Sequence, residues 1–227
     1  MKAIVGVLHT SLIFVTAEPM VRELFHELLP DARVADLVDG DLLATVQRER
    51  VISTESVQRM CHLALAAEAA GADAMFSLCS SLGPAIDVAR KLTRVPIVKI
   101  DDAMARAAVS SARRIGVLAT VPSTVVPSTD LVQAHAREAG RDITVTSYLC
   151  EGALSILMGG DRERHDEMVI EGARALSSEV DVIILAQASM ARLEARLSAE
   201  TGMNVLASPR RGVEELVRVL SAPAAGA

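Results

Sequence analysis

The sequence predicts an α/β protein made of two pseudo-symmetric lobes, each a parallel β-sheet flanked by helices. Three observations point to this fold: short β-branched segments alternate with longer helical ones, the two halves share motifs, and the core is aliphatic. Such alternation is typical of βαβ units. Hydrophobic residues make up 51% of the chain but aromatic residues only 2%, so Ala, Val, Leu and Ile must fill the core. These side chains suit parallel strands that are covered by helices on both faces.

The expected strands are short apolar runs that end in polar residues or turn signals. They cover residues 3–8, 33–36, 74–78, 97–100, 114–118, 144–148, 182–185 and 205–207. Helical patterns lie between the strands, for example at residues 19–29, 54–70, 82–91 and 128–139. The helix over residues 54–70 has Ser53 or Thr54 as its N-cap and stops before Gly71, as helices commonly do.

Three motifs of the first half return in the second half, in the same order and at nearly constant spacing. Residues 5–10 (VGVLHT) return as 115–120 (IGVLAT), residues 37–40 (LVDG) as 149–152 (LCEG), and residues 72–79 (ADAMFSLC) as 180–187 (VDVIILAQ). The repeat therefore pairs Thr10 with Thr120 and Cys79 with Gln187. A repeat of this length indicates a duplicated structural unit.

The repeat also sets the expected domain boundaries. Lobe 1 is expected at residues 1–102 and lobe 2 at residues 103–209, with a C-terminal helix at about residues 210–220 packing back on lobe 1. Residues 221–227 are small and featureless and are expected to fray. Ligands of open parallel sheets bind beyond the carboxyl ends of the strands. The active site is therefore expected in the cleft between the lobes, with Asp39 and Glu151 as further candidates beside the paired residues.

Composition argues against several classes of partner and cofactor. The net charge of −6 and the lack of a basic stripe make nucleic acid an unexpected partner. No apolar run approaches the roughly 20 residues of a membrane span, and the first strand is too short for a secretory signal. Three cysteines without metal-binding spacing indicate free thiols in a reducing, cytoplasmic compartment. Glycine-rich phosphate loops are absent and no constellation of metal ligands is visible, so we expect neither a cofactor nor a metal. A homo-oligomer, dimer or larger, is expected because lobed α/β enzymes of this size often dimerise.

Cys79 is the first candidate for chemistry. It ends an apolar strand and is followed by Ser80 and Ser81, then by a predicted helix. Backbone N–H groups and the positive end of a helix dipole favour a thiolate at such a turn. The same N–H groups and the two serine hydroxyls can hold a substrate carboxylate. The alternative is a buried cysteine that acts as a small hydrophobe.

Two further strand ends carry hydroxyl groups. Thr120 and Thr124 lie at a strand-to-helix turn and suit a second carboxylate clamp, although Ser123 or Thr124 could equally be a helix N-cap. His9, Thr10 and Ser11 end the first strand. His9 can exchange protons near pH 7, or can simply form hydrogen bonds at the edge of the cleft.

The remaining cysteines, histidines and acidic candidates have mainly structural explanations. Glu151 could bring a carboxylate to the cleft, but it could also be a helix N-terminal charge, with Cys150 in the core. Cys61 is expected to be a packed thiol inside a helix. The other histidines lie on polar or charged helical segments and are expected to be solvated: His26, His62, His135 and His165.

With these residues in hand, the chain resembles the aspartate/glutamate racemase superfamily, which includes hydantoin racemases, maleate isomerase and arylmalonate decarboxylase. The resemblance covers about residues 1–219 and rests on three stretches, 79–81 (CSS), 116–120 (GVLAT) with Thr124, and 181–190 (DVIILAQASM). It implies two pseudo-symmetric α/β lobes with the site between them. It also implies that Ser189 belongs to the substrate-binding set. Family racemases use one cysteine on each face of the substrate, but Gln187 stands at the second position here.

The departure at Gln187 decides which reactions the sequence favours. An amide neither gives nor takes protons at neutral pH, so a symmetric two-thiol racemase is disfavoured. The leading hypothesis is a cofactor-independent racemase or isomerase acting on a small carboxylate, with Cys79 as the proton-transfer group and an enediolate-like intermediate. Gln187 would then donate a hydrogen bond to the oxyanion, and His9 or Glu151 would act from the other side. Alternatives are a one-thiol decarboxylase or lyase, and a carboxylate-binding protein without catalysis.

Overall fold

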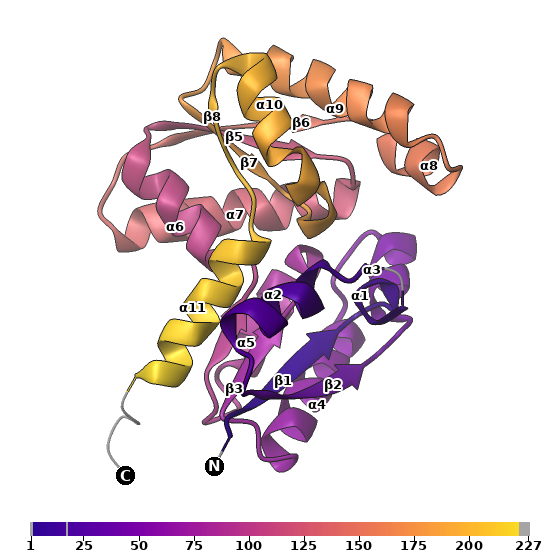
Figure 1. The fold of residues 1–227 in the computed structure, drawn as a ribbon, viewed down its shortest axis with the longest axis vertical. Coiled ribbons are helices and arrows are strands. Elements are labelled where there is room, and N and C mark those ends of the chain that lie inside the picture. The colour runs from indigo at the N-terminus through magenta and orange to yellow at the C-terminus, as the bar shows by residue number, and fades with distance from the viewer. Residues whose placement is uncertain (1, 17, 223–227) are drawn as a thin grey trace. The chain divides into compact units, whose positions relative to one another are not determined.

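The chain folds into two compact units. The computed structural model describes residues 2–16 and 18–222, so residues 223–227 of the predicted tail lie outside the described residues. Unit 1 comprises Met1–Ile100 and Pro209–Ala227, and unit 2 comprises Asp101–Ser208. In Figure 1, unit 1 carries the indigo and purple elements together with the yellow C-terminal helix. In the described part of the chain, no helix is long and apolar enough to span a membrane.

Each unit contains a four-stranded, wholly parallel sheet, and the strand order is the same in both. The strands of unit 1 run in the order β2-β1-β3-β4 and those of unit 2 in the order β6-β5-β7-β8. The strand bounds are β1 Ile4–His9, β2 Arg33–Val38, β3 Ala74–Ser77, β4 Ile97–Lys99, β5 Arg114–Ala119, β6 Thr144–Leu149, β7 Val182–Leu185 and β8 Asn204–Leu206. The predicted fold class and pseudo-symmetry are confirmed, and each predicted strand overlaps an observed one.

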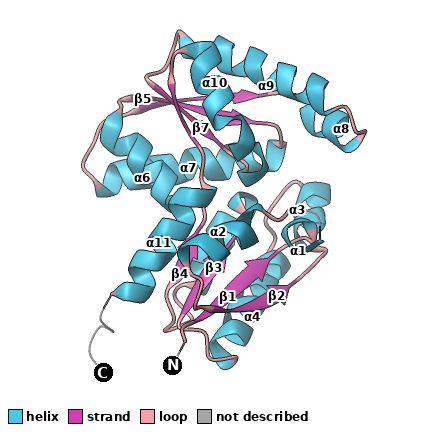
Figure 2. Cartoon of the chain, viewed as in Figure 1, coloured by secondary structure: helices cyan, strands magenta, loops and turns pink. Residues whose placement is uncertain are grey.

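Helices flank both sheets, as Figure 2 shows. In unit 1 they are α1 Ile13–Thr16, α2 Met20–Leu28, α3 Leu42–Glu49, α4 Thr54–Ala69, the 3-10 helix η1 Ser80–Leu82, α5 Gly83–Ala89 and α11 Pro209–Ser221. In unit 2 they are α6 Asp102–Ser111, α7 Pro122–Glu138, α8 Ala153–Met158, α9 Arg162–Ser177, the 3-10 helix η2 Ala188–Leu193 and α10 Glu194–Thr201.

Each sheet of the protein is buried between two helical layers. In unit 1, α4 and α5 pack on one face around Leu8 and Met75, while α2 and α11 cover the other face, where Phe25 contacts Phe76. In unit 2, α9 packs on one face around Leu185, and α6 and α7 pack on the other around Val117. Helix α11 follows β8 in sequence but belongs to unit 1, where it packs against α2, β3 and β4. The C-terminal end of the chain therefore helps to cover the sheet that the N-terminal half forms.

One predicted helix begins later in the sequence than the observed one. Helix α7 was expected at residues 128–139 but starts at Pro122 and continues through Pro127. Pro122 occupies a first-turn position, where a missing N–H costs nothing. Pro127 lies further inside the helix and removes one helical hydrogen bond. Beyond it, Val132 and Ala136 pack against the unit 2 core and hold the rest of the helix in place.

Gly6 and Gly116 explain why the repeat preserves a glycine in each central strand. A Cβ atom on Gly6 would lie 2.8 Å from Cβ of Ala67 in α4, and one on Gly116 would lie 3.1 Å from a methyl group of Val180. Real Cβ atoms essentially never lie within 3.0 Å of another heavy atom, and 3.1 Å is tighter than nine in ten of their contacts. The chain can therefore bring a helix or its following turn directly onto each central strand only because these positions have no side chain.

We predict that Gly6→Ala lowers the free energy of unfolding by about 1–3 kcal/mol, because the added methyl group overpacks the contact with Ala67. Urea unfolding followed by circular dichroism measures the change. Gly40→Ala is the matched control, since its Cβ would meet Leu12 at an ordinary 3.4 Å. Equal unfolding free energies of Gly6→Ala and wild type would contradict the close approach.

Candidate functional site

The carboxyl edge of the unit 1 sheet brings three of the sequence candidates together. Strand β1 lies between β2 and β3, and Leu8 pairs with both Leu37 and Ser77. Thr10, Asp39 and Cys79 each follow these paired positions by two residues, so they leave neighbouring strands at the same edge. The backbone closes this edge through bonds from Asp39 N to His9 O (2.9 Å) and from Leu43 N to Thr10 O (2.9 Å).

Cys79 lies between a fully buried strand and a tight helical turn. It is the N-cap of η1, with extended backbone angles (φ −119°, ψ 105°), and α5 continues directly from this turn. Its side chain is half-buried and packs against the core beneath α4 and α5. Ser80 is half-buried and Ser81 is buried at 2% exposure in the same turn. The sequence-predicted cluster of a thiol and two hydroxyls is therefore present.

The other two cysteines are buried and unsuited to chemistry. Burial raises the pKa of Cys61, and burial with the nearby Glu171 carboxylate raises the pKa of Cys150 to about 11. Both thiols stay protonated at neutral pH. Of the chain's three cysteines, all of which are described, Cys79 is the one that is not buried.

Asp39 is held by an arginine. Nε and Nη2 of Arg59 donate to its two oxygens at 2.7 Å and 2.6 Å, and these bonds hold the pKa of Asp39 below its usual value. An ionised carboxylate with both oxygens bound to a guanidinium is a poor base. Its contribution at this edge is to fix the loop after β2 against α4.

In unit 2 an amide joins the two equivalent strand ends. Thr120, which follows β5, donates from its backbone N (2.8 Å) and its Oγ1 (3.1 Å) to Oε1 of Gln187, which follows β7. Nε2 of Gln187 donates to Oγ1 of Thr124, whose hydroxyl donates to the carbonyl of Val121 at 2.8 Å. The structure thus brings together Thr120 and Gln187, which the repeat singles out, and Thr124, which was a candidate from the strand-to-helix turn.

Cys79 and Gln187 occupy equivalent places in the two units. Each follows a four-residue buried strand, and each is the N-cap of a 3-10 helix with an extended backbone, φ −122° and ψ 136° for Gln187. Ser189 is half-buried in η2, as Ser81 lies in η1. The N-cap alternative for Ser123 or Thr124 is wrong, because α7 begins earlier and Val121 is its N-cap.

Glu151 and Cys150 differ in their surroundings, although they are neighbours. Glu151 is exposed beyond the end of β6, whereas Cys150 is buried against Gly172 of α9, where an added Cβ would lie only 2.7 Å from its sulfur. The structural interpretation of Cys150 as a core thiol is therefore confirmed. No hydrogen bond of the Glu151 side chain ties it to Thr120 or Gln187 among the described residues.

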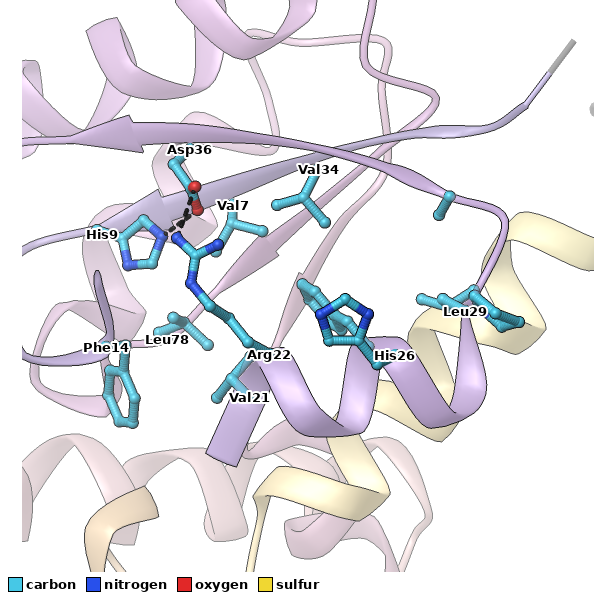
Figure 3. Close-up of a pocket in the computed structure, with 13 residues that line it drawn as sticks. Val7, His9, Phe14, Val21, Arg22, His26, Leu29, Val34, Asp36 and Leu78 are labelled. Carbon is cyan, nitrogen blue, oxygen red and sulfur yellow. Dashed lines mark hydrogen bonds and ion pairs between the residues drawn. The ribbon is translucent and has the colours of Figure 1, made fainter. Parts of the chain in front are cut away.

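His9 lies on the face of the unit 1 sheet that α2 covers, away from the α4–α5 face against which Cys79 packs. Its Nε2 donates to Oδ1 of Asp36 at 2.8 Å, and Arg22 donates to the other oxygen of Asp36 at 3.0 Å (Figure 3). His9 is 3% exposed, and burial lowers its pKa despite the neighbouring carboxylate. Thr10 is buried and Ser11 half-buried beyond it. The structure does not group His9 with Cys79.

A buried ionic cluster in unit 2 escaped sequence reasoning. His165, expected to be solvated, is 2% exposed, and its Nδ1 lies 2.8 Å from Oδ1 of Asp166. Arg192 of η2 binds the same carboxylate, with Nη1 2.6 Å from Oδ2. Burial raises the pKa of Asp166, but the bonds from Arg192 and His165 together outweigh it and leave this pKa lowered. The pair ties η2, and with it the turn after Gln187, to the start of α9.

The helical phase could have revealed His165. It lies four and eight residues before Val169 and Ala173, both buried in the unit 2 core, so it shares their stripe. The charged residues around it masked that stripe. His135 is also bound rather than solvated, with Nε2 3.2 Å from Oδ1 of Asp102. Within the described ranges, no cluster of His, Cys, Asp and Glu could hold a metal ion.

We predict that native protein treated with iodoacetamide is alkylated at Cys79 alone, because Cys61 and Cys150 are buried thiols. Peptide mass spectrometry locates the modification. Protein unfolded in urea, which exposes all three cysteines, is the control. Native alkylation of Cys150 at the rate of Cys79 would contradict the burial and raised pKa of Cys150.

The lowered pKa of the buried His9 leads us to predict that the protein loses stability as the pH falls below 6.5. Its folded-state pKa is lowered from 6.5, so below this pH the unfolded chain takes up a proton that the folded protein does not. The unfolding free energy should therefore fall, by up to about 1.4 kcal/mol per pH unit, until the folded state also protonates.

Urea unfolding at pH 7, 6 and 5 should show a shallower decline for His9→Gln than for wild type. The variant His62→Gln, which removes an exposed histidine of α4, controls for the loss of any histidine. Parallel declines in wild type and His9→Gln would show that His9 does not titrate as its burial requires.

The comparisons with known proteins agree with this geometry. A model of the Asp/Glu/Hydantoin racemase family matches residues 16–216. Glutamate racemase RacE1 from Bacillus anthracis has a TM-score of 0.74 at 20% identity, covering 96% of this chain and 81% of its own. Aspartate racemase from Picrophilus torridus has a TM-score of 0.70 at 14% identity, covering 96% of this chain and 94% of its own.

Allantoin racemase from Klebsiella pneumoniae has a TM-score of 0.63 at 18% identity, covering 96% of this chain and 87% of its own. No curated protein matches the chain in sequence. At these identities the structures show the fold, and the family model supplies the assignment. The chain therefore belongs to the Asp/Glu/hydantoin racemase family and is an enzyme of the racemase or isomerase type.

Proposed function

We propose that this protein is a cofactor-independent enzyme that moves a proton at the α-carbon of a small carboxylate, with Cys79 as the proton-transfer group. The Cys79 thiolate takes the α-proton, and the electron pair of the broken C–H bond is delocalised into the carboxylate as an enediolate. Return of the proton from the Cys79 thiol to carbon regenerates the thiolate; when a second donor protonates the carbon instead, Cys79 is left as a thiol and gives its proton to solvent, while the second donor takes one up. The observation that carries this proposal is that Cys79, at the carboxyl edge of its sheet, is half-buried, whereas Cys61 and Cys150 are buried thiols with raised pKa values.

The η1 turn supplies the groups that would hold the carboxylate in unit 1. Ser80 and Ser81 follow Cys79 directly, and Thr10 and Ser11 follow the neighbouring strand β1. Hydroxyl and N–H groups that point to a developing oxyanion stabilise it more than the ground state when they are fixed in advance. The short turn between a buried strand and α5 provides such fixation.

In unit 2 the donors of Thr120 already have an acceptor. Oε1 of Gln187 receives two hydrogen bonds from Thr120, as a carboxylate oxygen would. A substrate carboxylate could take over these two bonds, and the freed Gln187 amide would then turn to donate to it. Thr124, Ser189 and the exposed Glu151 complete the proposed substrate-binding set.

The amide at position 187 favours one second candidate. A one-thiol decarboxylase or lyase needs a proton donor on a single side of the enediolate. In decarboxylation the bond between carbon and the leaving carboxylate breaks, CO₂ departs, and the electron pair left on carbon takes the Cys79 proton. Gln187 in place of a second thiol suits this one-sided reaction.

We predict that Cys79→Ser and Cys79→Ala lose at least 100-fold of the activity, the usual contribution of a positioned acid or base. Wild type and both variants are incubated in D₂O with small amino acids, hydroxy acids and mono- and dicarboxylates, and α-C–H signals are followed by NMR. Deuterium incorporation with inversion identifies a racemase, and CO₂ release identifies a decarboxylase. Cys61→Ser is the matched control and should retain activity.

Activity that survives in Cys79→Ala would refute the role of Cys79. Carboxylates that stabilise the protein thermally without any reaction would favour a binding protein. Gln187→Cys introduces a second thiol and so tests the role of the amide. If a second thiol is all that a racemase reaction lacks, this variant should exchange the α-proton for deuterium at both faces of the α-carbon.

A further inference from the structure

An ion pair lies between η2 and α9 of unit 2, in a mostly buried position. Nη1 of Arg192 is 2.6 Å from Oδ2 of Asp166, and Nη2 of Arg192 donates to Oδ1, so each carboxylate oxygen has its own bond. Asp166 is 7% exposed, and the buried His165 contacts the same carboxylate, with Nδ1 2.8 Å from Oδ1. A two-bond contact between a guanidinium and a carboxylate fixes the orientation of both groups as well as their distance.

Arg192 belongs to the same short helix as the groups proposed for substrate binding in unit 2. Gln187 is the N-cap of η2, where its carbonyl accepts the backbone N–H of Met190 at 3.1 Å, and Ser189 lies in the helix itself. Met190 and Leu193 pack into the unit 2 core. Because apolar contacts are non-directional, they set the depth of η2 but restrain its rotation less. The ion pair supplies the directional restraint.

Unit 1 builds the equivalent turn without an ion pair. The repeat that pairs residues 72–79 with residues 180–187 also aligns α4 with α9, and both helices are 16 residues long. In this alignment Gln58 and Pro84 stand where unit 2 has Asp166 and Arg192. The turn itself therefore forms without these charges. A buried ion pair also gains little net stability over an apolar pair, because the loss of hydration offsets the attraction.

We propose that Arg192 and Asp166 are positioning residues for the carboxyl edge of the unit 2 sheet. By tying η2 to α9, they hold the Gln187 amide where Thr120 and Thr124 bind it. Neither member of the pair has to touch the substrate, since both act through η2. This inference rests on the proposed function, because the placing of the Gln187 amide matters to a reaction only if a substrate carboxylate binds at this edge.

Hydrogen exchange of the Gln187 side-chain amide tests the proposal in protein without substrate. ¹H–¹⁵N NMR follows this amide, whose signals are identified by their absence in Gln187→Met. In wild type the bond to Thr124 should make its exchange slower than that of the exposed Gln133 in α7. We expect Arg192→Met and Asp166→Asn each to accelerate Gln187 exchange at least about tenfold, because local opening of the turn then costs less free energy. Backbone amides of β5 and β7 should exchange as in wild type.

Two further variants separate the directed contact from charge alone. Arg192→Lys keeps the positive charge but lacks the planar fork that binds both carboxylate oxygens, so its Gln187 exchange should lie between those of wild type and Arg192→Met. Arg174→Met is the matched control, since it removes an ion pair between α9 and Glu200 of α10 (2.6 Å) and should leave Gln187 exchange unchanged. Circular dichroism and thermal unfolding verify that each variant is folded.

Unchanged Gln187 exchange in folded Arg192→Met and Asp166→Asn would overturn the proposal. Equally accelerated exchange in β5 and β7 would also overturn it, because the pair would then stabilise the whole unit rather than position one turn. In the D₂O assay, Arg192→Met should raise KM more than it lowers kcat, and a fall in kcat alone would contradict a role in placing the binding groups. The exchange measurement needs no substrate, so a failure of the proposed reaction at Cys79 leaves its outcome intact.

Discussion

The parallel pairing of the two innermost strands in each sheet brings the strand ends of Thr10 and Cys79 to one edge of the unit 1 sheet, and those of Thr120 and Gln187 to one edge of the unit 2 sheet. Strand β1 pairs with β3, and β5 with β7, so that both strands of each pair end at the same edge. β3 and β7 are only four residues long and fully buried, and two residues separate each of them from the 3-10 helix that follows. Parallel strands leave unpaired backbone groups and turn residues at their carboxyl ends, which is where ligands of such sheets bind. The helices on both faces bury the sheets and leave this edge for polar residues.

The two units have the same architecture but different chemistry at this edge. In unit 1 the second residue after the short strand β3 is the half-buried thiol Cys79, which two serine hydroxyls follow. In unit 2 the equivalent residue is an amide whose oxygen accepts two bonds from Thr120. A thiol can carry a proton and an amide cannot, so the proton transfer that we propose falls to Cys79 of unit 1. In unit 2 the Asp166–Arg192 ion pair ties η2, which follows Gln187, to α9.

The sequence predicted the sheets better than the contacts of polar side chains. Buried strands such as Val182–Leu185 are recognisable because an uninterrupted apolar run can only be buried, and the repeat then fixed their equivalence. The start of α7 was missed because Pro127 looks like a helix stop, whereas tertiary packing carries the helix past it. Burial of His165 was hidden by its charged neighbours, and the bond between His9 and Asp36 depends on the register of two strands far apart in sequence. Cys79 was identifiable because strand end, thiol and hydroxyls are contiguous in the chain.

The most direct measurement compares alkylation of Cys79 by iodoacetate and iodoacetamide, which are similar in size and differ in charge. If the groups after Cys79 bind a carboxylate, iodoacetate is held beside the sulfur and iodoacetamide is not. The ratio of the iodoacetate rate to the iodoacetamide rate at Cys79 should then be at least tenfold higher in the native protein than in the urea-unfolded chain. It should also fall when Ser80 and Ser81 are both replaced by alanine. Equal ratios in the native and unfolded protein would show that Cys79 has no carboxylate site beside it, and would contradict the proposed chemistry at this edge.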